Sequence, residues 1–330
     1  MSSHVYQNLA NFPEYKDFRY RFDFVTVVMS ISFLFFIPSF YCTSKMLIFY
    51  FKNHKKITTT SNGIHPIVFK SFLVMQFWNT VNTILNFCAT RIPNTSVFTS
   101  FCVSLGPDTF FRFVLFGLYV TFNNAQFFTG LFCSIRVMIM YTLVNQNTLC
   151  QRLFWSWSAI SYFISVLYSL PITFDSVLCT QLDWPFQDGA IIISSAFLSG
   201  NARMSNLLFG LSTFVIVVIV ITTVMVIVKL RSKAMKEASH RSLRRAKAET
   251  TLTVTMILII IPSLLAQGLL IANLNKSPYY SFILCVRPLM LDLRVHVVSI
   301  YFYLTHPLFK KKVGTSPSTL AVKSFGSATY

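Results

Sequence analysis

Charged residues, and acidic ones above all, are scarce in this sequence. Only 10 of the 330 residues are Asp or Glu, and charged residues make up 12% of the chain, whereas soluble globular domains carry about 25%. Hydrophobic residues account for 54%. Because so few charges are available to cover the surface of a soluble domain, the composition indicates a membrane protein.

The sequence also lacks the motifs that carry common catalytic chemistry. It has no Gly-rich phosphate loop, no HExxH motif, no nucleophile elbow and no carboxylates paired on one helix face. Its seven Cys include no CxxC pair and no Cys/His cluster at zinc spacing. We therefore predict no catalytic residue, no metal site and no cofactor, and an enzyme is the least favoured class.

Long apolar segments are what the sequence has instead. Charge is costly in hydrocarbon, so uncharged stretches of about 20 residues predict transmembrane helices. We expect an all-α membrane fold, a seven-transmembrane helix bundle within residues 24–307, with an N-terminal segment at 1–23 and a tail at 308–330. The predicted spans are about residues 24–48, 66–89, 111–141, 153–174, 205–228, 250–273 and 280–304. Two shorter apolar stretches are interpreted differently, 92–107 as a loop and 189–202 as either a loop or an early turn of the fifth span.

The basic residues predict the orientation of the bundle. The net charge of +18 is spread over short segments between apolar runs, so it does not form the basic face typical of nucleic-acid binding, and no nucleic-acid partner is predicted. An extracellular N-terminus and a cytoplasmic C-terminus put most of the 28 Lys and Arg in the cytoplasm, as the positive-inside rule requires. Two sequons then fall outside, which makes glycosylation candidates of Asn94 and Asn275.

Two cysteines share the predicted outer side. Cys102 precedes the third span and Cys179 follows the fourth. A disulfide is plausible there because the compartment is oxidising, the alternative being two unpaired thiols. The other five Cys lie in or beside spans, where Cys commonly acts as a small apolar residue.

Polar residues inside the spans are the candidates for ligand contact. In the second span three Asn recur at spacings of three and four, which places them on one face that should turn toward the bundle. That face serves either hydrogen bonds between helices or a ligand. The seventh span holds Arg287, Asp292, Arg294 and His296, which either lock it to its neighbours or take part in ligand contact or switching. The ligand-binding candidates are Asn79, Asn82, Asn86, Arg112, Asn123 and Asp292.

Basic residues on the predicted cytoplasmic side are candidates for coupling to a partner protein. Arg136 closes the third span, where it either snorkels to the lipid headgroups or pairs differently in a resting and an active state. The basic segment from Lys229 to Glu249 fits anionic lipid or an acidic protein surface. The coupling candidates are Arg136, Lys229, Arg231, Arg244 and Arg245.

Several blocks of the sequence resemble nematode chemoreceptors of serpentine receptor class U. The blocks run from Arg91 to Cys102, from Phe127 to Arg136, from Cys179 to Ala190, and from Tyr303 to Pro307 with Lys310–Lys312 after it. The resemblance extends over roughly residues 20–312. It implies a G-protein-coupled receptor in the plasma membrane of sensory cilia on chemosensory neurons, with a small-molecule ligand, a heterotrimeric G protein and the lipid bilayer as partners.

The chain departs from the rhodopsin pattern, because no acidic residue precedes Arg136 and the seventh span has no NPxxY sequence. The rhodopsin-type ionic lock is therefore not carried over. A ligand is expected between helices in the outer half of the bundle, with the inner ends of spans five and six moving in response.

Two alternatives belong to other functional classes, a ligand-gated channel subunit and a small-solute transporter. Channel subunits of the insect chemosensory type place the N-terminus inside, which is the opposite orientation. An odd number of spans and the lack of an inverted repeat count against a transporter.

Overall fold

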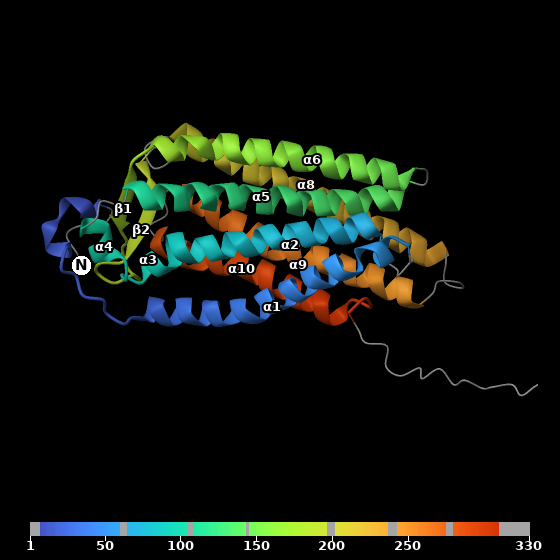
Figure 1. The fold of residues 1–330 in the computed structure, drawn as a ribbon, viewed down its shortest axis with the longest axis horizontal. Helices are drawn as coiled ribbons and strands as arrows, with labels where there is room; N and C mark the ends of the chain where they lie inside the picture. Colours follow the sequence, from blue (N-terminus) through green and yellow to red (C-terminus); the bar gives the residue numbers. More distant parts are fainter. Residues whose placement is uncertain are drawn as a thin grey trace, which may run out of the picture.

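A computed structural model describes residues 7–59, 65–104, 108–142, 145–196, 202–236, 243–274 and 280–309. Seven long helices dominate this part of the chain (Figure 1). They are α1 (Phe24–Thr59), α2 (Pro66–Asn86), α5 (Asp108–Tyr141), α6 (Gln146–Ser169), α8 (Ala202–Lys236), α9 (Leu243–Leu274) and α10 (Tyr280–Thr305). A helix satisfies all of its own backbone hydrogen bonds, which is why long apolar segments in lipid adopt it.

Short elements gather at one end of the bundle, which we call the cap end (Figure 1). A π-helical turn η3 (Phe87–Arg91) and α3 (Ile92–Asn94) continue α2, and η4 (Leu170–Phe174) continues α6. The other short elements are η1 (Leu9–Asn11), η2 (Pro13–Tyr15), α4 (Thr99–Ser104), β1 (Val177–Gln181) and β2 (Ile191–Ser195). The two strands form an antiparallel hairpin in which Cys179 lies opposite Ile193.

The seven long helices differ in how apolar they are. Among the described residues, four helical stretches are long and apolar enough to cross a membrane, namely Phe24–Asn53, Gln146–Phe174, Phe209–Ser232 and Lys247–Leu269. The other three long helices, α2, α5 and α10, hold buried polar side chains such as Asn79, Arg136 and Asp292. Because these side chains face protein rather than lipid, they do not prevent the helices from spanning. The all-α seven-helix bundle agrees with the prediction.

Six of the long helices form a closed ring that includes α5, and α6 packs on its outside against α5 and α2. Helix α5 packs against α2, α6 and α8, and the ring continues from α8 to α9, α10, α1 and back to α2. Aromatic rings fill the interior away from the cap end. Phe72 stacks on Phe302 with 4.0 Å between ring centroids and meets Phe132 edge-on at 5.6 Å. Such pairs add to the burial energy of each ring, and these join α2, α5 and α10.

Helices α1 and α8 are longer than the predicted spans, since they continue to Thr59 and Lys236, whereas α2 ends at Asn86, before the predicted residue 89. The two short apolar stretches contain regular structure that was not predicted. The stretch 92–107 does not span the membrane, as expected of a loop, but it contains the short helices α3 and α4. Residues 191–195 form a strand instead of a loop or helical turn. Residues 191–195 form a strand because they pair with residues 177–181. The sequence of 191–195 alone does not predict this pairing.

The N-terminal segment folds onto the hairpin. Asn8 forms an isolated antiparallel bridge with Thr180, and the Gln181 N–H donates to the Gln7 carbonyl at 3.1 Å. The Tyr15 hydroxyl donates to the carboxylate of Asp188 at 2.9 Å. Residues 7–15 are therefore part of the cap.

Candidate functional site

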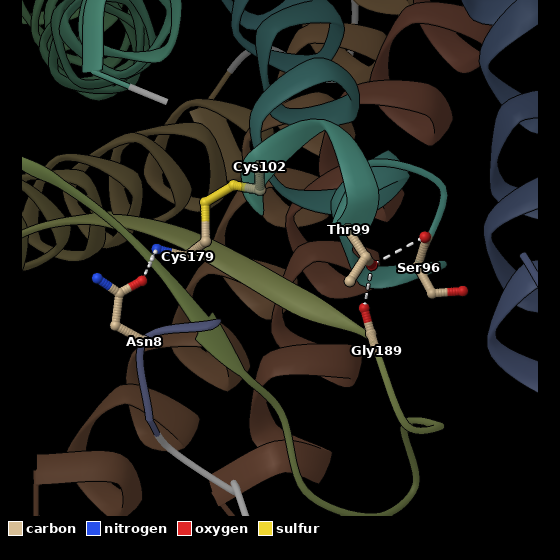
Figure 2. The surroundings of a disulfide bond; sticks show 6 residues. All are labelled: Asn8, Ser96, Thr99, Cys102, Cys179 and Gly189. Atoms are coloured by element: carbon tan, nitrogen blue, oxygen red, sulfur yellow. Dashed lines mark hydrogen bonds between the residues drawn. A yellow bond between two sulfur atoms is a disulfide. The ribbon is translucent and has the colours of Figure 1, made fainter. Parts of the chain in front are cut away.

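A disulfide ties the cap together. Cys102 on α4 and Cys179 on β1 are bonded (Figure 2), with 6.5 Å between their Cα atoms. The Cys179 N–H donates to Oδ1 of Asn8 at 3.3 Å. The Thr99 hydroxyl lies within hydrogen-bond distance of the carbonyl oxygens of Ser96, at 2.9 Å, and Gly189. Three segments distant in sequence thus close this end of the bundle.

Gly189 is suited to its place in the hairpin loop. Its φ of +83° lies in the left-handed region that favours glycine. The ring of Phe18 from the N-terminal segment also packs where a Cβ atom would stand. A larger residue at this position would push the N-terminal segment off the cap.

We expect that Cys102→Ser will lower the stability of the protein by about 2–4 kcal/mol, because the cross-link restricts the unfolded chain. Thermal unfolding of the purified protein measures the loss. Cys88→Ser is the matched control, since Cys88 is a free, exposed cysteine. Equal unfolding temperatures for the two variants would show that the cross-link adds no stability.

The structure argues against the glycosylation predicted for Asn94. The residue is 1% exposed. With its amide oriented to donate, Nδ2 lies 2.9 Å from the Thr90 carbonyl oxygen and 3.0 Å from that of Ile191. A glycan on this nitrogen would displace both bonds and has no room. Asn275 lies outside the described residues.

A buried ion pair lies beneath the cap. Arg91 Nη1 is 2.5 Å from Oδ2 of Asp292 on α10, and the two side chains are 2% and 7% exposed. Ser32 on α1 joins them, accepting from Arg91 Nη1 at 2.6 Å and donating to Asp292 Oδ2 at 3.0 Å. Arg91 Nε donates to Asn86 Oδ1 at 2.9 Å, and the guanidinium lies 4.1 Å from the ring centroid of Phe87.

The predicted second span ends at residue 89 and so leaves Arg91 outside it, but η3 carries this side chain inward, where it is buried. A π-helical turn is wider than an α-helical one, so residues five apart, such as Asn86 and Arg91, come to the same side. Asp292, a predicted ligand contact, is thereby engaged by an arginine of the protein itself. One turn along α10, His296 lies 6.0 Å from Phe36 between ring centroids, and neither of its nitrogens has a hydrogen-bond partner within the described ranges.

The three Asn of α2 face inward as their spacing predicted, and each has a partner on another element or turn. Asn79 Oδ1 accepts from Arg294 Nη2 at 3.1 Å. Asn82 Oδ1 accepts from the Thr121 hydroxyl at 3.4 Å, and Asn86 Oδ1 accepts from Arg91 Nε. The face was predicted to serve either hydrogen bonds between helices or a ligand. These contacts are hydrogen bonds within the bundle.

A narrow pocket lies between α5, α8, α9 and α10. Its polar lining comes from all four helices and consists of Gln126, Ser212, Ser263, Gln267, Arg287 and Arg294. Gln267 Nε2 donates to the Thr213 hydroxyl at 2.7 Å, and the Ser212 hydroxyl donates to Gln267 Oε1 at 3.1 Å. The space between the side chains holds about one water molecule. A larger ligand therefore has to move side chains apart.

None of the six predicted ligand contacts lines this pocket. Asn79 is adjacent to it through Arg294. Arg112 lies in the second turn of α5, and Asn123 is 4% exposed with an Nδ2 that has no partner among the described residues. The signal that would have found the pocket is the spacing of Arg287, Leu291 and Arg294, because residues four and seven apart share one helix face.

Arg136 lies at the opposite end of the bundle, near the end of α5. It is 5% exposed, so it does not snorkel to the lipid surface. Its Nη2 donates to the hydroxyl of Thr253 on α9 at 3.5 Å, and the charge of Glu249, one turn earlier on α9, acts on it. The acidic residue that influences Arg136 electrostatically thus lies on α9, and it is not the residue that precedes Arg136.

The other predicted coupling residues lie on α8 and α9. Lys229 Nζ lies 4.8 Å from the ring centroid of Tyr141 at the end of α5, and Arg231 is exposed. Arg244 and Arg245 are in the first turn of α9, and their side chains lie outside the described residues.

The family model of the serpentine type seven-transmembrane G-protein-coupled chemoreceptor Sru matches residues 9–312. The chain belongs to this family. Family membership confirms the resemblance to class U receptors, and the family is one of receptors instead of enzymes. The chain is also similar to serpentine receptor class U-26 of Caenorhabditis elegans, with 23% identity over 178 residues. That match covers 52% of this chain and 59% of the relative, which is less than two thirds of the relative's length.

Proposed function

We propose that this Sru-family protein is a chemosensory receptor of the plasma membrane that binds a small molecule inside the bundle and signals through a heterotrimeric G protein. The family match over residues 9–312 carries the proposal. Its resemblance to class U chemoreceptors favours a place in the sensory cilia of chemosensory neurons. Disulfides persist in oxidising compartments, so the bonded cap end is assigned to the outside and Arg136 to the cytoplasm.

Helix α9 supplies the physical link between ligand and G protein in this proposal. It lines the pocket with Ser263 and Gln267 and contacts Arg136 through Thr253. Pro262 lies between these two contact regions within the helix. A proline removes one backbone hydrogen bond and kinks a helix, so a shift at the pocket can move the inner half of α9. A ligand drives this change only if it binds the two states with different affinity.

The orientation is tested with epitope tags at the two ends of the full chain. We expect the N-terminal tag to be stained on intact cells and the C-terminal tag only after permeabilisation. Staining of both tags on the same side would contradict the seven-span receptor. An N-terminus inside the cell would favour the channel-subunit alternative.

Signalling is tested in cells that express the full chain together with a promiscuous G protein, after the N-terminal tag has shown surface delivery. A panel of small volatile and water-soluble compounds is applied. We expect a compound that raises the second-messenger signal only in cells with the chain. A ligand-evoked current that persists when G proteins are inactivated would contradict the proposal and indicate a channel.

A further inference from the structure

Two arginines of α10 give the pocket a positive charge. Arg287 and Arg294 both line it, and seven residues apart on a helix they lie two turns, about 10 Å, from each other on one face. Arg294 is 7% exposed, and its Nη groups donate to Ser263 at 3.2 Å and to Asn79 at 3.1 Å. Both of these acceptors are neutral. The Nε of Arg294 is buried and has no partner among the described residues.

Arg287 is still less satisfied. Its Nε is buried without a hydrogen-bond partner within the described ranges. The ring of Phe122, also in the pocket wall, lies 6.0 Å from the guanidinium carbon, which is the outer limit of a cation–π contact. Arg287 as a whole is partly buried, and a cation held away from water without an anion costs free energy.

The acidic residue of the same helix does not balance these charges. Asp292 is bound to Arg91 on η3 and to Ser32 on α1, and it does not line the pocket. Arg91, by comparison, is a buried arginine whose charge and N–H groups have partners. It contacts a carboxylate, a hydroxyl, an amide oxygen and an aromatic ring. Within the described ranges no carboxylate pairs with either pocket arginine, and intramembrane charges of this kind are typical of functional sites.

We propose that the pocket binds a small organic anion, a short monocarboxylate, whose carboxylate is held between Arg287 and Arg294. The proposal rests on the receptor function and names its ligand class. A guanidinium presents paired N–H groups that match the two oxygens of a carboxylate. The remaining wall, with Val215, Ile216 and Ile219 beside Ser212 and Gln267, suits a short apolar chain. The narrowness of the pocket selects a ligand of few heavy atoms.

The first test measures the thermal unfolding of the purified full chain in detergent. The probes are the sodium salts of the straight-chain acids from formate to hexanoate and of benzoate, each paired with its methyl ester. We expect at least one carboxylate to raise the unfolding temperature by a few degrees while its ester has no effect. The shift should be lost in Arg287→Gln and Arg294→Gln. It should persist in Arg152→Gln, because Arg152 is exposed on α6.

Three outcomes of this test overturn the anion site. They are an equal shift with the ester, a shift that persists in both pocket variants, and the lack of a shift with every carboxylate of the panel. A carboxylate that shifts unfolding but evokes no G-protein signal in cells would leave the anion site standing and count against the receptor function.

A second test needs no ligand. Arg287→Met removes a partly buried cation that pairs with no carboxylate among the described residues, so we expect the unfolding temperature of the ligand-free protein to rise by a few degrees. Arg91→Met is the contrasting variant, because it strands Asp292 and should lower that temperature. If Arg287→Met lowered it as well, Arg287 would be a structural residue and the proposal would fail.

Discussion

Asp292→Ala should lower the stability of the protein by about 3–5 kcal/mol, because it leaves the buried charge of Arg91 without its anion. Arg91 is 1% exposed, and its other polar contacts, to Ser32 and Asn86, are neutral. A guanidinium in this place has no water to replace the carboxylate. We expect a lower unfolding temperature in detergent and less protein at the cell surface. Asp17→Ala is the matched control, since Asp17 is exposed.

A double variant separates the ion pair from the individual charges. Arg91→Met combined with Asp292→Leu removes both ions and keeps comparable volumes, so it should recover a large part of the stability lost in either single variant. If the losses were simply additive, the two residues would not be coupled and the ion pair would not be the cause. If Asp292→Ala kept full stability but abolished the cellular response, Asp292 would instead be the ligand contact that its sequence position first suggested.

The helices of this protein are predictable from sequence because each depends on the length and apolarity of its own segment, which are local properties. Length and apolarity of one segment suffice to place a helix in lipid, and the seven segments agree with the seven long helices. The inward turn of Asn79, Asn82 and Asn86 is local too, since it follows from helical spacing alone. The same local rule misplaced Arg91, because the rule ends a span at a charged residue.

The candidate site is less predictable because its parts come from different helices. Gln126, Ser212 and Gln267 each lie in an otherwise apolar segment, and only the packing of α5, α8 and α9 brings them together. The partner of Arg136 is another example. Glu249 is distant in sequence, so the lack of an acidic neighbour on α5 gave no indication that α9 supplies one.

Glu249→Gln should raise basal G-protein signalling, whereas Arg136→Gln should lower the ligand response with surface expression unchanged. In the structure Arg136 donates to the hydroxyl of Thr253 on α9, and the charge of Glu249, one turn away on that helix, acts on Arg136 electrostatically. If these contacts belong to the resting state, weakening them favours the state in which Arg136 meets the G protein. A coupling of 1–3 kcal/mol corresponds to a change of about 5- to 150-fold in that equilibrium.

The opposite signs of the two variants distinguish a switch from a structural contact. A structural pair would give two variants that both lose surface expression, because each would strand a buried polar group. A switch gives one active and one silent variant at equal surface amounts, and the double variant should be silent, since it lacks the residue that meets the G protein. Arg231→Gln is the control for lost positive charge on an exposed neighbour. A full response from Arg136→Gln would refute the role of this residue and leave α9 without a connection to the G protein.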